Sequence, residues 1–263
     1  PDEIETDITA VDISGNNVSY SVPDIKNMAS WRKSDSEADT WLADIVFNTD
    51  AVYGFSISYN DIAKNPAEYM NGGNEKYDTY PEDNFTVVKS GPSDLKIVSI
   101  SSNYKNTWNR ILSAVTFGYY SYQDEVTVTI QATDRISGVD YFDWEYNREA
   151  GASTDNVEKL TGRINSNNIT YSSDKGIATA SFTIAANAVN YQQIRGYISL
   201  TAYNNAGVSS NYSDDSTVVI IDTIAPERTV TYSPAKQVAD SVMYYDGTVN
   251  ARFEVKEANF YPE

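Results

Sequence analysis

A strand, a proline-bearing connector and a second strand occur in that order twice in this chain. Residues 87–92 and residues 220–226 each combine an apolar pair, a short polar stretch and a proline. An alternating apolar and polar pattern follows each connector, at residues 95–100 and 228–232. Because two connectors of one kind separate stretches rich in strand patterns, the sequence predicts a tandem array of small β domains.

Strand patterns also dominate the rest of the sequence. Large apolar residues alternate with small or polar ones, as is typical of strands with one buried face, at residues 53–59, 126–130, 177–184 and 249–255. Turn-forming pairs such as Ser137-Gly138 lie between these patterns. Short strands separated by turns predict β-sandwiches. Short helices or helical turns are compatible only with residues 24–30, 156–164 and 187–193.

Composition limits the classes of partner. The chain has 263 residues, of which 41% are hydrophobic, and this is enough for two domains with separate cores. Its formal net charge of -18 would repel phosphate groups, so we expect neither nucleic-acid binding nor a role at an anionic membrane surface. No run of about 18 apolar residues occurs. We therefore expect no membrane insertion, and we expect any export signal or wall anchor to lie outside this stretch.

The sequence contains neither cysteine nor histidine. These two absences exclude thiol nucleophiles, Ser-His-Asp triads and zinc or copper sites built on Cys or His. The 37 acidic residues single out no pair for glycoside hydrolysis, so we expect a protein without catalytic activity or cofactor. Calcium stays a minor alternative, because carboxylates cluster at residues 2–7, 35–39 and 214–215.

Several segments carry a resemblance to a known family. Residues 55–65 and 198–207 both run from a strand through Tyr-Asn into a polar turn around an alanine, and residues 221–226 form an Ile-Asp-Thr-Ile-Ala-Pro connector. Residues 133–139 contain an Asp-x-x-Ser-Gly-Val turn, and residues 257–263 contain a Glu-x-Asn-Phe segment. In these features the chain resembles the bacterial Ig-like repeats of very large Gram-positive cell-surface proteins.

The resemblance implies an all-β fold of tandem Ig-like β-sandwich domains joined by short Pro-containing linkers. It divides the chain into the later part of one domain at residues 1–91, a complete domain at residues 92–225 and the first strands of a further domain at residues 226–263. The first domain would then lack its early strands. We predict that residues 228–255 supply them, through strand exchange with a neighbouring molecule or by folding back within the chain.

The same resemblance implies an extracellular protein of the bacterial cell surface that works as an adhesin-like module and captures a host protein. Some proteins of this kind bind immunoglobulin through the variable domain of the Fab heavy chain and act as B-cell superantigens. Two alternatives stay open: a structural spacer that projects a distal adhesin or hydrolase from the wall, and a carbohydrate-binding module.

Tyrosine is frequent, with 21 residues beside four tryptophans. Tyrosines on loops provide large, rigid and partly polar contact area, which is how many protein-binding surfaces are built. Aromatic residues within strand patterns are instead expected in the core, among them Trp41, Phe47 and Trp144. The tyrosines that fall outside strand alternation, and that we predict to contact a protein partner, are Tyr69, Tyr77, Tyr80, Tyr119, Tyr120 and Tyr122.

Overall fold

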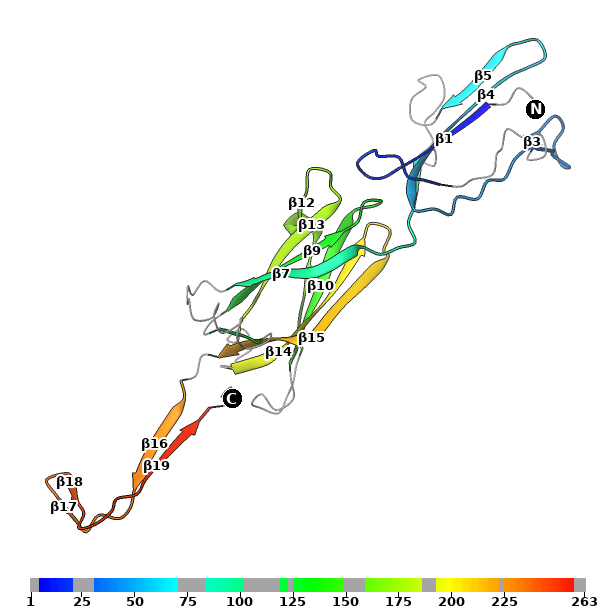
Figure 1. Cartoon of the computed structure of the whole chain (residues 1–263). Helices are drawn as coiled ribbons and strands as arrows, with labels where there is room; N and C mark the ends of the chain where they lie inside the picture. The colour runs from blue at the N-terminus through cyan, green and yellow to red at the C-terminus, as the bar shows by residue number, and fades with distance from the viewer. Residues whose placement is uncertain are drawn as a thin grey trace.

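The structure is a computed structural model that describes residues 5–20, 31–70, 84–101, 119–122, 125–148, 159–185, 193–222 and 225–257. These residues form nineteen strands and one 3-10 turn, η3 (Ser166–Asn168), so the all-β prediction is confirmed. Figure 1 shows three regions arranged in a line: an N-terminal sheet, a central pair of sheets and C-terminal hairpins.

The central region, which we call the central sandwich, consists of two sheets (Figure 1). One sheet has the strand order β12-β13-β9-β7 and the other has the order β11-β10-β14-β15-β8. Neighbouring strands are antiparallel except for β15 and β8, which are parallel. The strands are β7 (Ser93–Ser101), β8 (Tyr119–Tyr122), β9 (Val126–Thr133), β10 (Val139–Arg148), β11 (Leu160–Ile164), β12 (Thr170–Tyr171), β13 (Ile177–Ile184), β14 (Gln193–Asn204) and β15 (Ser209–Asp222).

Alternation of residue types gives the central sandwich its core. Every second residue of β9, from Val126 to Ala132, is buried, whereas the residues between them are partly exposed. The buried side chains share one cluster with Phe142 of β10 and Leu200 of β14 on the opposite sheet. Each large apolar side chain buried in this way contributes roughly 1.5–3 kcal/mol. The packing of one sheet on the other is therefore the main source of stability in this region.

The long strand β4 organises the N-terminal sheet. It pairs antiparallel with β1 along one edge and with both β5 and β6 along the other. Among the residues that the structure describes, the buried core here comprises Ala10, Ala51 and Tyr53, and Phe47 packs on Tyr53 with 4.8 Å between ring centroids. The strands are β1 (Glu5–Val11), β4 (Ala51–Asn60), β5 (Pro66–Met70) and β6 (Asn84–Val87), beside a separate pair formed by β2 (Arg32–Lys33) and β3 (Trp41–Leu42).

The N-terminal sheet and the central sandwich test several predictions made from the sequence. Phe47 and Trp144 pack against core clusters, as predicted. Trp41 was placed in a core and this was wrong, because β3 pairs only with the short β2 and leaves the indole 45% exposed. The helical alternative for residues 156–164 was also wrong, since residues 160–164 pair with β10 as strand β11. Residues 24–30 and 187–192 lie outside the described part of the chain.

The C-terminal region consists of two hairpins. Strand β16 (Glu227–Tyr232) pairs antiparallel with β19 (Ala251–Lys256), and β17 (Gln237–Ala239) pairs with β18 (Val242–Tyr244). The strand patterns predicted in this region are therefore confirmed. These strands pair with one another and not with the N-terminal sheet, which lies at the opposite end of the line of regions (Figure 1). The prediction that residues 228–255 fold back onto the N-terminal sheet of the same chain was therefore wrong.

The connector between β6 and β7 is held from both sides. The carboxylate of Asp50 accepts hydrogen bonds from the backbone N–H groups of Lys89 at 3.0 Å and Ser90 at 3.1 Å. The side-chain amide of Asn204 donates to the carbonyl of Ser90 at 3.1 Å. At Gly91, an added Cβ would lie 2.3 Å from a backbone oxygen of β15, so only glycine fits there. These contacts fix the path of the chain into the central sandwich.

A turn after β1 reaches the same end of the central sandwich. The N–H of Ile13 donates to the carbonyl of Arg135 at 2.7 Å, and the hydroxyl of Ser14 donates to the carbonyl of Asp174 at 2.8 Å. Arg135 also pairs with the Asp174 carboxylate at 2.6 Å. The hydroxyl of Ser172 and this guanidinium together lower the pKa of Asp174 to about 2. We use the name junction for the contacts of this turn together with those of the connector between β6 and β7.

Candidate protein-binding surface of the central sandwich

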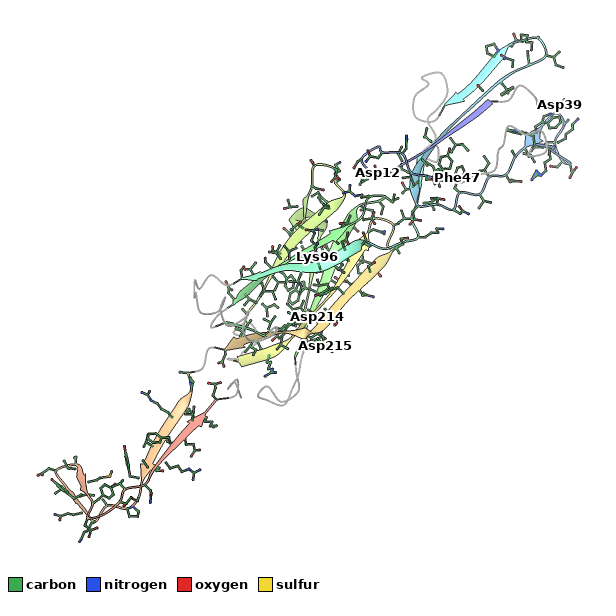
Figure 2. The ribbon with its side chains drawn as sticks, in the orientation of Figure 1. Asp12, Asp39, Phe47, Lys96, Asp214 and Asp215 are labelled. Carbon is green, nitrogen blue, oxygen red and sulfur yellow. The ribbon has the colours of Figure 1, made fainter. Side chains whose placement is uncertain are left out.

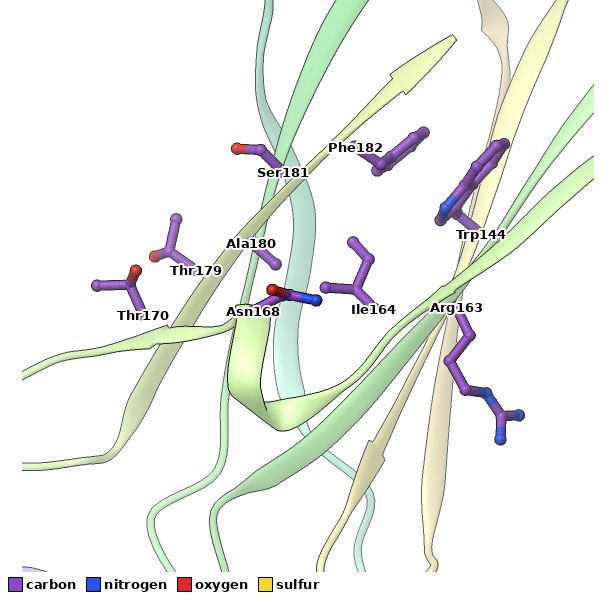
Figure 3. Close-up of a pocket in the computed structure, with 9 residues that line it drawn as sticks. All are labelled: Trp144, Arg163, Ile164, Asn168, Thr170, Thr179, Ala180, Ser181 and Phe182. Atoms are coloured by element: carbon purple, nitrogen blue, oxygen red, sulfur yellow. The ribbon is translucent and has the colours of Figure 1, made fainter. Parts of the chain in front are cut away.

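A groove of about 570 Å³ opens where the free edges of the two sheets of the central sandwich come together (Figure 3). One wall comes from β10 and β11, the other from β12 and β13, and η3 contributes to the lining. We call this feature the edge groove. Its lining residues are Trp144, Arg163, Ile164, Asn168, Thr170, Thr179, Ala180, Ser181 and Phe182.

A stacked aromatic pair forms the apolar part of the edge groove. The rings of Trp144 and Phe182 lie nearly parallel, with 4.4 Å between centroids and 10° between planes (Figure 3). Gly162 lies directly opposite Trp144 in the β10–β11 pairing, and a Cβ at Gly162 would lie only 2.6 Å from the indole. Gly162 therefore makes room for the indole ring. Trp144 is partly exposed, whereas Phe182 is buried in the core cluster, so the indole supplies most of the apolar surface that the pair presents to the groove.

Strand β13 has an open edge beside this groove. The N–H of Ser172 donates to the carbonyl of Ile177 at 2.9 Å, and the N–H of Ile177 donates to the Ser172 hydroxyl at 3.0 Å, so the backbone of Ile177 faces the β12 side. Because backbone direction alternates along a strand, the N–H and C=O groups of Ser181 and Thr183 face the same side, beyond the end of β12. In the described part of the chain no strand pairs with them there. This edge can accept an additional strand.

A charged and aromatic row lies on the outer face of the five-stranded sheet, and one of its residues, Arg163, also lines the groove. Arg163 donates two hydrogen bonds to the carboxylate of Asp143, at 2.7 and 2.8 Å, and these bonds raise the pKa of the guanidinium. The same guanidinium lies 4.0 Å from the ring centroid of Tyr141, which stacks on Tyr203 at 4.4 Å. A bidentate pair held over an aromatic ring is a fixed arrangement, so it presents a preformed contact surface.

The polar residues farther along this face are also tied together. The hydroxyl of Thr201 donates to the side-chain carbonyl of Asn211 at 2.9 Å. The amide of Asn147 donates to the hydroxyl of Ser199 at 2.9 Å, and that hydroxyl lies 3.2 Å from the hydroxyl of Ser213. All five side chains are partly or fully exposed. Short side chains that are already ordered lose little entropy on binding, which favours a flat polar contact with a protein.

Of the tyrosines predicted to contact a partner, the four that the structure describes lie on strands that do not line the edge groove. Tyr69 was predicted in a loop, but it belongs to β5 and pairs with Ile57 of β4. Residues 119–122 were also placed outside strands, but they form β8, whose backbone pairs with residues 218–221 of β15. Both placements were wrong because pairing with a long neighbouring strand decides the conformation of these short runs. Tyr77 and Tyr80 lie outside the described residues.

Acidic residues do not converge on one point in the described part of the chain. Figure 2 shows Asp39 at the far end of the N-terminal region, Asp12 near the junction, and Asp214 with Asp215 on the central sandwich. Among the described residues, no three or more acidic side chains are placed to hold a metal ion. Neither residues 35–39 nor residues 214–215 form such a group, while residues 2–4 lie outside the described part.

Comparisons with known proteins give no further guidance to the function. No protein-family model matches the chain, and no curated protein matches it at a significant level. Within the described residues, no helix is long and apolar enough to cross a membrane.

The edge groove was not predicted from the sequence. Trp144 was assigned to the core from its strand pattern, and Phe182 belongs to another strand pattern on a different sheet. Only the packing of the two sheets brings the two rings together. One local signal was available. Gly162 lies in the middle of strand β11, and a glycine inside a strand often marks the close approach of another group.

Proposed function

We propose that this chain is a non-enzymatic module of the bacterial cell surface, built from tandem Ig-like sandwiches, that captures a host protein. The strand order supports an Ig-like assignment. In their order across the sheet, β7, β9, β13 and β12 correspond to strands A, B, E and D of an Ig domain, and in the other sheet β10, β14 and β15 correspond to C, F and G. The sequence resemblance to bacterial Ig-like repeats points to the same class.

The observation that carries the proposal is the open edge of β13 beside the edge groove. An extended segment of a partner adds to this edge through the backbone groups of Ser181 and Thr183. An apolar side chain of the partner then packs against Trp144 and Phe182. The backbone contacts supply affinity without regard to sequence, and the groove selects the side chain. This mode needs only groups that the sandwich already presents.

Immunoglobulin is the host protein that the resemblance suggests, bound through its heavy-chain variable domain. A variable domain is itself a sandwich with edge strands, so it can supply the extended segment that the open edge accepts. Affinity capture from human serum and mucosal secretions tests this choice, with a sandwich of equal charge as the control. Selective recovery of heavy and light chains supports it. Recovery of nothing above the control contradicts it.

A pair of variants tests the edge itself. Ser181→Pro removes the outward backbone N–H and is tolerated on an open edge, whereas Ser181→Ala removes only the hydroxyl. We expect Ser181→Pro to weaken binding of the captured protein by about tenfold and Ser181→Ala to leave it unchanged. Thermal melting of both variants confirms that they are folded. Equal binding by Ser181→Pro and the unaltered chain would rule out the edge as the binding surface.

The tyrosine prediction is tested in the same assay. If Tyr77 and Tyr80 contribute contacts, the double variant Tyr77→Ala and Tyr80→Ala weakens binding of the captured protein without lowering the melting temperature. Unchanged binding by the folded double variant rules out these two tyrosines as contacts. Competition by soluble glycans would instead favour the carbohydrate-binding alternative.

A structural spacer is the second candidate, and the junction supports it. The connector donates backbone hydrogen bonds to Asp50 and accepts one from Asn204, and Ser14 bonds to the central sandwich independently. A connector fixed in this way suits a stiff rod, since a flexible link would leave neighbouring regions free to reorient. The two functions are compatible. If the chain captures no host protein and scatters X-rays as a rigid rod, only the spacer function remains supported.

A further inference from the structure

Two tyrosines on the outer face of the five-stranded sheet meet as a stacked pair. Tyr141 of β10 and Tyr203 of β14 lie directly opposite each other in the antiparallel pairing of their strands. Their ring centroids are 4.4 Å apart and their planes differ by 18°. Both residues are partly exposed. Two phenol rings are therefore held against each other at a surface that small oxidants in solution can reach.

Arg163 holds one ring of this pair in place. Its guanidinium lies 4.0 Å from the centroid of the Tyr141 ring, and it comes from β11, on the side of β10 away from β14. The guanidinium and the Tyr203 ring therefore cover opposite faces of the Tyr141 ring. Two hydrogen bonds to Asp143 fix the guanidinium. Because the two rings are held in contact, a reaction between them is favoured by proximity.

Another tyrosine pair in the described part of the chain lacks this combination. Tyr20 and Tyr53 meet edge to face, with 6.0 Å between ring centroids and 85° between planes. Tyr53 is buried, and the rings of Phe47 and Phe85 pack on it. An oxidant in solution therefore has no direct access to that ring. Among the described residues, Tyr141 and Tyr203 are the two tyrosines that combine stacking with exposure.

We propose that Tyr141 and Tyr203 are a site of oxidative cross-linking, where hydrogen peroxide and a peroxidase convert the pair into a dityrosine. Each phenol loses one electron and its hydroxyl proton. The two phenoxyl radicals then join through a carbon–carbon bond between ring positions ortho to the oxygens, and the hydrogen on each of these carbons moves to its oxygen. Hydrogen peroxide takes up the two electrons and two protons and becomes two molecules of water. The new bond links β10 to β14 in a chain that has no cysteine for a disulfide.

The test is peptide mapping by mass spectrometry after the dilute full chain is treated with hydrogen peroxide and a peroxidase. We expect a cross-linked peptide pair that contains Tyr141 and Tyr203, in a monomer whose mass is lower by two hydrogen atoms. Tyr203→Phe should reduce the dityrosine fluorescence of the monomer at least about fivefold, since the stacked partner is lost. Tyr197→Phe is the matched control, because Tyr197 is partly exposed on the same strand but lies opposite Asn147 and Val218. Cross-links that leave out the stacked pair, or equal fluorescence of both variants, would overturn the proposal.

Thermal melting gives a second, independent readout. A covalent link between β10 and β14 restricts the unfolded chain, so the oxidised chain should melt at a higher temperature than oxidised Tyr203→Phe. Before oxidation, the melting temperatures of the two chains should be nearly equal, which shows that the variant is folded. If oxidation raises neither melting temperature, the link does not join the strands of the folded sheet and the proposal fails. Neither measurement depends on capture of a host protein.

Discussion

The central sandwich and the C-terminal hairpin are built from similar strands, but they differ in what covers the apolar face. In β9 the inward residues are buried by a second sheet, whereas in β16 and β19 every residue is exposed. The alternating pattern therefore determines that a strand has an apolar face, and the topology determines whether that face is covered. Most of the stability of such a chain resides where two sheets meet.

The largest expected effect separates these two regions directly. Phe142→Ala removes a fully buried ring from the core and should lower the free energy of unfolding of the central sandwich by about 3–5 kcal/mol. Phe253→Ala removes an exposed ring and should change this free energy of unfolding by less than about 0.5 kcal/mol. Guanidinium unfolding of dilute samples measures both. Similar losses in the two variants would show that the hairpin is covered in the monomer.

The next effect sharpens the comparison at the junction. Gly91→Ala forces a Cβ against backbone at 2.3 Å, so the connector or β15 has to move, at a cost of about 1–3 kcal/mol. Gly247→Ala is the matched control in the C-terminal region, because nothing lies within 4 Å of the added atom. Thermal melting compares the two. No change in Gly91→Ala would indicate that the connector is loosely held.

A smaller effect concerns a buried hydroxyl of the central core. Tyr146 is fully buried and donates a hydrogen bond of 2.7 Å to the carbonyl of Val219. Tyr146→Phe leaves that carbonyl without this donor and should cost about 1–2 kcal/mol. Tyr232→Phe in the exposed hairpin should cost nothing measurable. If both variants unfold at the same denaturant concentration as the unaltered chain, the hydrogen bond contributes no net stability.

The smallest effect depends on pH. The pKa of Asp174 falls from an ordinary 3.8 to about 2 in the folded state, because the Ser172 hydroxyl and Arg135 favour the carboxylate. A lowered pKa stabilises the folded state fully above pH 3.8, and this stabilisation is lost as the pH falls through about 2. The difference in melting temperature between the unaltered chain and Asp174→Asn should therefore shrink over that window. A constant difference would assign no role to the charge.

The sequence predicted the strands well because their signal is local. Residues 177–184 alternate with period two, and they form β13 with the same bounds. Tyr69 and residues 119–122 lacked such alternation, yet they became strands because long neighbours supply their hydrogen bonds. Pairing across the sheet can override local preference, and it cannot be read from a short run of residues.

The candidate site was less predictable than the fold. The edge groove depends on contact between Trp144 and Phe182, which come from different sheets, and on the place where β12 ends. Both follow from how two sheets stack, which residue periodicity does not encode. The tyrosine excess pointed to a binding protein in general, but it did not indicate the edge of β13.

The most direct test of the proposed function is hydrogen exchange of the chain with and without human immunoglobulin Fab. If the partner adds a strand to β13, the amides of Ser181 and Thr183 become protected when Fab is present, while those of β9 on the inner side stay as they are. Protection confined to other surfaces, or no protection under conditions where Fab is in large excess, would contradict the assignment of this edge as the binding surface.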